Sequence, residues 1–106
     1  MNTATIGITI NLKAKPGQEE ALATFLKEGA KIVRATEAGT LFWHAFRTGP
    51  SQFVICDGFA SEEGVQAHFN GQVAAALQVQ ATALVEGGWE NGVVRNVVRS
   101  EILASK

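Results

Sequence analysis

The chain has 106 residues, the size of one domain with a single hydrophobic core. Nine basic and ten acidic residues give a formal net charge of -1, without a basic stripe or an acidic tail, which argues against a nucleic-acid or membrane-surface partner. The single cysteine, Cys56, cannot form an intrachain disulfide, and with two histidines it cannot complete a structural zinc site. We therefore expect no metal site and a reducing compartment.

Neither of the two segments that could direct the chain to a membrane has the required pattern. The first residues, MNTATIGITINLK, lack a basic region followed by a continuous apolar block, so they favour a strand over a signal peptide. The apolar run at residues 73–85 is interrupted by Gln78 and Gln80 and is too short for a membrane span. These patterns predict a cytoplasmic protein with no membrane partner.

Hydrophobic periodicity predicts the elements in chain order. Ile6, Ile8, Ile10 and Leu12 alternate with polar residues or glycine, which indicates a strand with one apolar face. An amphipathic helix is predicted from residue 18 to about 35, followed by strands at 41–47 and 52–59. Ser61 is typical of a helix N-cap, and two helices are predicted around the break at Asn70-Gly71, the second over residues 72–86. Residues 93–103, rich in valine and isoleucine, are predicted to form the last strand.

This order of elements predicts an α+β fold, with a four-stranded antiparallel sheet and helices on one side. In the second strand Phe42, His44 and Phe46 lie on one face, while Trp43 lies on the other, so both faces are apolar. Helices can cover only one of them, and a second subunit packed sheet to sheet would cover the other, which predicts a homodimer. The alternative is a tightly packed central strand within a monomer.

Several segments together resemble the antibiotic biosynthesis monooxygenase superfamily: KPGQEEALATFLK (15–27), TLFWHAF (40–46), FVICDGFASEEGVQAHFN (53–70) and the closing valine-rich strand. The resemblance spans nearly the whole chain, so residues 1–106 are predicted to be one such domain. It implies a ferredoxin-like βαββαβ protomer, a dimeric α+β barrel, and a small-molecule pocket between the sheet and the helices of each protomer.

The resemblance also implies a range of activities. Members of the superfamily include cofactor-free oxygenases of quinols, anthrones and related aromatic polyketides, haem-degrading enzymes, and many proteins of unassigned function. The haem-degrading members use an asparagine, a tryptophan and a proximal histidine. Asn11 could supply the first, but His68 stands where the tryptophan is expected and no histidine follows in the last helix. We therefore expect no haem and no other cofactor.

A cofactor-free oxygenase needs a base, an apolar cavity and groups that hold a substrate anion, with dioxygen as the second substrate. His68, in VQAHFN, corresponds to the histidine of the family's "EAH" segment and is our first candidate for the base. His44 is the alternative. Burial tends to lower the pKa of an imidazole, which would keep it neutral and able to accept a proton. The hypothesis is thus a cofactor-independent monooxygenase acting on a small aromatic quinol or polyketide.

The remaining candidate residues would bind the substrate: Asn11, Phe42, Trp43, Phe46, Asp57 and Phe69. Several of the candidates have a structural alternative. His68 and His44 could be packed core residues, Asn11 an exposed strand residue, Asp57 a strand end, and Trp43 part of the dimer interface. The alternative function is a non-catalytic ligand-binding or stress-response protein that keeps the same fold.

Overall fold

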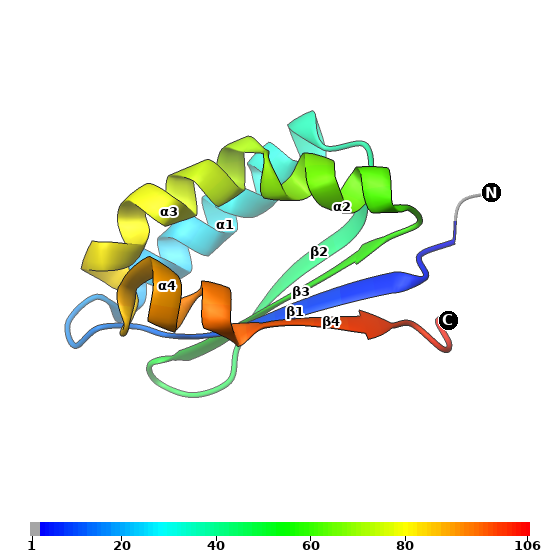
Figure 1. Ribbon diagram of the computed structural model, residues 1–106. Helices are drawn as coiled ribbons and strands as arrows, with labels where there is room; N and C mark the ends of the chain where they lie inside the picture. Colours follow the sequence, from blue (N-terminus) through cyan, green and yellow to red (C-terminus); the bar gives the residue numbers. More distant parts are fainter. Residues whose placement is uncertain (1–2) are drawn as a thin grey trace.

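The sheet is centred on β3 (Gln52–Phe59) and β1 (Ile6–Lys13) in the computed structural model, which describes residues 3–106. The strand order is β2-β3-β1-β4, with β2 (Thr40–Arg47) and β4 (Val97–Glu101) at the edges. All three pairings are antiparallel. The predicted α+β fold, a ferredoxin-like sheet with its helices on one face, is confirmed (Figure 1). Met1 and Asn2, at the start of the predicted domain, lie outside the described residues.

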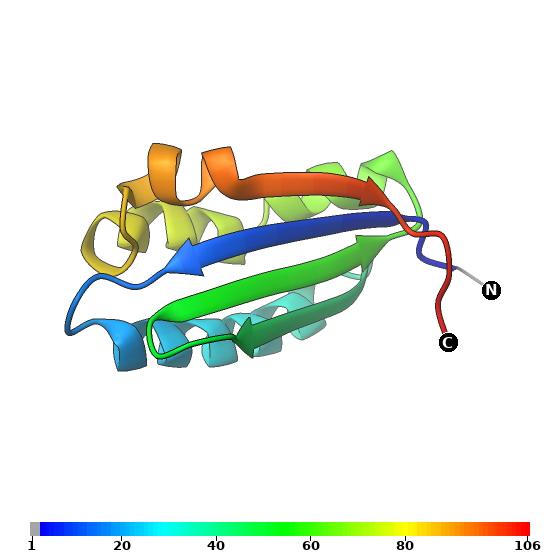
Figure 2. The same ribbon diagram turned by 90° about the horizontal axis from the view of Figure 1, so that it is seen from below.

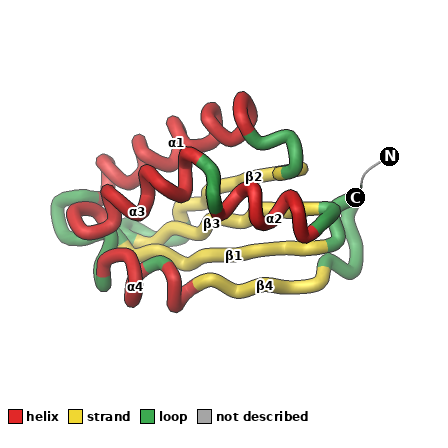
Figure 3. The backbone as a smooth tube through the Cα atoms, turned by 45° about the horizontal axis from the view of Figure 1, so that its top comes forward, coloured by secondary structure: helices red, strands yellow, loops and turns green. Residues whose placement is uncertain are grey.

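The core lies between this sheet and the helices. Ile8, Ile10 and Leu12 of β1 and Phe53 and Ile55 of β3 are buried on the helix side, at alternate positions as the period of a strand requires. Helices α1 (Glu19–Thr36) and α3 (Gln72–Leu84) lie side by side over this face (Figure 3). The apolar stripe that predicts α1 is therefore the stripe that the helix buries.

The short helix α2 (Glu62–Phe69) has a side-chain cap at its start and one close backbone contact with the connection between α1 and β2. The Ser61 hydroxyl accepts a hydrogen bond from the Gly64 N–H at 3.2 Å, which caps α2 as predicted. Gly64 then packs against Gly39 in the connection between α1 and β2, where an added Cβ on Gly64 would lie 2.8 Å from the Gly39 carbonyl oxygen. Only glycine permits this approach, which brings His68 toward the end of α1.

The segment after α3 differs from the prediction of a helix to residue 86 and a strand from residue 93. Helix α3 ends at Leu84, and Val85 forms a β-bridge with Ala14. Gly87 and Gly88 then take left-handed conformations, with φ of 86° and 66°, and turn the chain into the short helix α4 (Gly88–Gly92) and the 3-10 turn η1 (Val94–Asn96). Strand β4 therefore starts only at Val97.

Within residues 3–106, no helix lies on the opposite side of the sheet, as the view from below shows (Figure 2). We call this side the open face; it carries Thr9, Asn11, Phe42, His44, Phe46, Val54, Cys56 and Val98. Phe46 and Val98 are each 51% exposed, and the rings of Phe42 and His44 stack with centroids 5.5 Å apart. Among residues 3–106, no helix combines the length and the hydropathy that a bilayer span needs.

Candidate functional site

A cavity of about 470 Å³ lies between the sheet and the helices. Its aromatic walls are Trp43, Phe69 and Trp89, and most of the remaining lining is aliphatic, from the middle of the sheet, from α3 and from residues 93–97. Within the part of the chain that the structure describes, His68 is the one titratable side chain in this lining. The cavity thus offers a flat ligand apolar surroundings and one ionisable contact.

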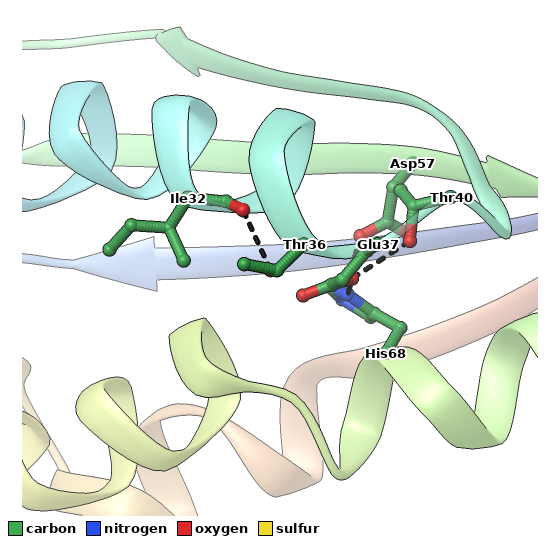
Figure 4. Close-up of polar contacts among 6 residues, drawn as sticks. All are labelled: Ile32, Thr36, Glu37, Thr40, Asp57 and His68. Carbon is green, nitrogen blue, oxygen red and sulfur yellow. Dashed lines mark hydrogen bonds and ion pairs between the residues drawn. The ribbon is translucent and has the colours of Figure 1, made fainter.

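His68 is buried at the end of α2 and lies between two buried carboxylates (Figure 4). Its Nδ1 is 2.6 Å from Oε1 of Glu37, and its Nε2 is 3.2 Å from Oδ2 of Asp57. The rings of Phe59 and Phe69 flank the imidazole, with centroid distances of 5.4 and 5.7 Å. We call Glu37, His68 and Asp57 the buried triad.

Glu37 of the triad directly follows α1 and is its C-cap residue. Its backbone N–H donates to the Val33 carbonyl, and its carboxylate oxygen Oε1 accepts a hydrogen bond from the Thr40 hydroxyl at 2.8 Å. Its other oxygen, Oε2, lies against Gly71, where an added Cβ would be 2.8 Å away. Backbone and side chain are therefore both fixed by neighbours.

Asp57 of the triad lies in β3, a central strand of the sheet. It sits in β3 between Ile8 of β1 and Trp43 of β2, and it is 0% exposed. Among residues 3–106, neither of its carboxylate oxygens has a hydrogen-bond donor, so its contact with His68 lacks hydrogen-bond alignment and is an ion pair when the imidazole is protonated. A buried carboxylate in this state favours a cationic or proton-donating neighbour.

The charges around the ring decide the protonation of His68. Burial lowers the pKa of its imidazole, but the contacts with Asp57 and Glu37 raise it, and the net result is a pKa above the ordinary 6.5. The expectation that burial would keep this ring neutral is wrong, because two carboxylates are buried with the ring and the sequence does not show them. The imidazolium form of this ring is therefore favoured more than in an ordinary histidine.

The structure brings some of the predicted site residues together and separates the others. His68, Trp43 and Phe69 line the cavity, and Asp57 contacts His68 from β3. Trp43 lies on the helix side of β2, near Gly29 of α1, and therefore not on the open face. The other four, Asn11, Phe42, His44 and Phe46, lie on the open face, because strand residues alternate between the two sides of the sheet. They do not reach this cavity.

Two residues of the site were missed by the sequence analysis. Trp89 lies in the glycine-rich segment Gly87 to Gly92, where only its size indicated a role, and Glu37 lies in a segment typical of an exposed turn. The signal for Glu37 was weak, because its burial depends on the contact between Gly39 and Gly64. Among the described residues, no group of three or more His, Cys, Asp or Glu side chains is arranged to hold a metal ion.

The chain is similar to proteins of known structure. The family model described as "Antibiotic biosynthesis monooxygenase" matches residues 5–80. A protein of unknown function from Nitrosomonas europaea is 40% identical, with a TM-score of 0.89 over 100% of this chain and 96% of that chain. A protein from Pseudomonas aeruginosa is 18% identical, with a TM-score of 0.73 over 100% and 99% of the two chains.

A Caulobacter crescentus protein named as a candidate antibiotic biosynthesis monooxygenase is 19% identical, with a TM-score of 0.73 over 97% of this chain and 92% of that chain. These last two likenesses are evidence of the fold alone. No curated protein matches the chain. The match of the family model over residues 5–80, together with the predicted and observed fold, shows that the chain belongs to the antibiotic biosynthesis monooxygenase family.

Proposed function

We propose that the protein is a cofactor-independent monooxygenase that acts on a small aromatic quinol or polyketide-type substrate. The observation that carries this proposal is the apolar cavity, in whose lining His68 is the single titratable group among residues 3–106. A flat substrate ring would lie between Trp43, Phe69 and Trp89, with a hydroxyl group directed to the histidine. Membership of the family supports the same class of reaction.

In the proposed reaction the protein removes one proton and keeps water away. The substrate O–H bond breaks, its proton goes to the neutral form of His68, and the electron pair stays on the substrate oxygen. The resulting anion is electron-rich enough to pass one electron to dioxygen, so the chain needs to supply only a base and an apolar site. Asp57 would stabilise the imidazolium formed in this step, because its carboxylate lies 3.2 Å from Nε2.

We also propose that the open face binds a second copy of the chain. Half-exposed Phe46 lies on this face beside the stacked Phe42 and His44, and half-exposed Val98 lies on the same face in β4, at the other edge of the sheet. No helix within residues 3–106 covers them. Members of the family are generally dimeric. In such a homodimer the four predicted residues that do not reach the cavity (Asn11, Phe42, His44 and Phe46) would lie at the interface between the two sheets.

Oxygen uptake tests the proposed activity. Purified protein without added metal, flavin or haem should accelerate oxygen consumption with at least one member of a panel of hydroquinones and anthrones. Ligand binding can be followed separately, because the chain has two tryptophans, Trp43 and Trp89, and both line the cavity. Quenching of their fluorescence without any oxygen uptake above background would instead support the non-catalytic ligand-binding protein.

A further inference from the structure

The two ring nitrogens of His68 lie at different distances from their carboxylate neighbours. Nδ1 lies 2.6 Å from Glu37 Oε1, a short hydrogen-bond distance that requires a proton between the two atoms. Nε2 lies 3.2 Å from Asp57 Oδ2, and within residues 3–106 that oxygen has no hydrogen-bond donor. Because a neutral imidazole carries one N–H, the shorter contact determines which nitrogen keeps it.

The geometry around Glu37 makes this arrangement rigid. The residue is 8% exposed, its N–H is bonded to the Val33 carbonyl, and its Oε1 accepts from Thr40 at 2.8 Å as well as from the imidazole. Gly71 closes the space behind Oε2. A carboxylate held in this way cannot turn away from the ring without losing two hydrogen bonds.

We propose that Glu37 is the positioning residue of this site: it keeps the His68 proton on Nδ1 and so leaves Nε2 as the nitrogen that exchanges protons. Glu37 does not line the cavity and would not touch the substrate. The expected effect of Glu37 on turnover rests on the proposed function, whereas its effect on which nitrogen of His68 carries the proton does not. The charged groups that face the ring are Glu37 and Asp57, and the flanking Phe59 and Phe69 carry no charge.

The tautomer of His68 can be measured on the unaltered protein, without any substrate. The chain has two histidines, so a ¹H–¹⁵N spectrum of the imidazole groups is simple, and a His44→Asn variant assigns its signals. Above the His68 pKa, the neutral ring should show a protonated Nδ1 and a bare Nε2. A neutral His68 that is protonated on Nε2 would overturn the proposal, whatever the protein catalyses.

A charge-removing variant tests the role of Glu37 directly. Glu37→Gln keeps the size of the side chain but removes its charge, so the His68 pKa should fall, and kcat should fall roughly ten- to hundredfold with little change in KM. Glu28→Gln, which removes an exposed carboxylate from α1, the helix that Glu37 caps, is the matched control and should change neither. A His68 pKa that is the same in the folded Glu37→Gln protein as in the wild type would contradict the proposal. If no substrate is turned over, the pKa and tautomer results still decide it.

Discussion

At the scale of single residues, His68 can be a base or only part of a buried charge cluster, and one substitution separates these roles. If it is the base, His68→Asn should leave the protein folded and lower oxygen uptake by roughly a hundredfold or more, the usual effect of losing a general base. If it is only structural, the free energy of unfolding should fall by about 1–3 kcal/mol while activity per folded molecule stays near normal.

Oxygen uptake and thermal unfolding, measured on the same preparation, distinguish these outcomes. His44→Asn is the informative comparison, because His44 lies on the open face and does not line the cavity. A fully active His68→Asn protein beside an inactive His44→Asn protein would show that the proposed base is the wrong histidine.

The pKa of His68 also predicts how activity and stability depend on pH. The pKa is raised above 6.5 in the folded protein, so the imidazolium form is favoured by folding. This stabilisation is fully present below the unfolded pKa and is lost as the pH rises through the folded pKa. The midpoint of thermal unfolding should therefore fall as the pH increases through this range.

Activity should change in the opposite direction, because only the neutral ring can accept the substrate proton. Oxygen uptake at subsaturating substrate should rise with pH, with its midpoint above 6.5. Proton NMR of the histidines, calorimetry and oxygen electrode measurements over one pH series would check both signs. A midpoint below 6.5 would mean that the carboxylates do not control this ring.

At the scale of elements, the placement of α2 depends on glycine, and the same glycine-to-alanine change at two positions should have different effects. Gly64→Ala would put a Cβ 2.8 Å from the Gly39 carbonyl oxygen, so α2 must shift, at a cost of about 1–3 kcal/mol in unfolding free energy. Gly29→Ala meets its nearest neighbour, Val73, at 3.4 Å, an ordinary contact, and should be neutral or stabilise α1 by up to about 1 kcal/mol.

Denaturant unfolding of the two variants measures both effects. The His68 pKa should also fall in Gly64→Ala, because a shifted α2 lengthens the contact with Glu37. Equal stability of the two variants would contradict the role given to the contact between Gly39 and Gly64.

The elements also show which features the sequence could predict and which it could not. The alternation in β1 and the apolar stripe of α1 are local patterns, so they predict those elements and the side that each one buries. The same alternation shows that His44 and Trp43 point to opposite sides of the sheet. Only the register and the covering helices, however, show that the cavity lies on the side of Trp43.

Two other features depend on contacts between distant segments, and no local pattern contains them. The burial of Glu37 requires Gly39 to pack against Gly64, a residue 25 positions further along the sequence than Gly39. The valines at 93 and 94 favour a strand by propensity, but the turn at Gly87 and Gly88 places them in the cavity lining instead. Tertiary contacts therefore decided the features that the sequence analysis missed.

At the scale of the whole molecule, the open face should determine the assembly. Light scattering after size exclusion should give about twice the 11.2 kDa mass of the chain. Phe46→Asp places a charge on the proposed interface and should shift the protein toward the monomer at micromolar concentration, because an unpaired buried carboxylate is costly. Val79→Asp is the control: this side chain is 81% exposed on α3, away from the open face, so its variant should remain a dimer.

Cys56 provides a second measure of the same interface, because it lies on the open face as the cross-strand neighbour of His44. In a sheet-to-sheet dimer the thiol is covered, so a thiol reagent should modify it slowly, and dilution or Phe46→Asp should accelerate the reaction. Val79→Asp should leave the rate unchanged. If Cys56 reacts at the same rate in the wild type and in Phe46→Asp, while the wild type elutes as a dimer, then the two copies associate through another surface. The open face would then have to be stable in water with Phe46 and Val98 exposed.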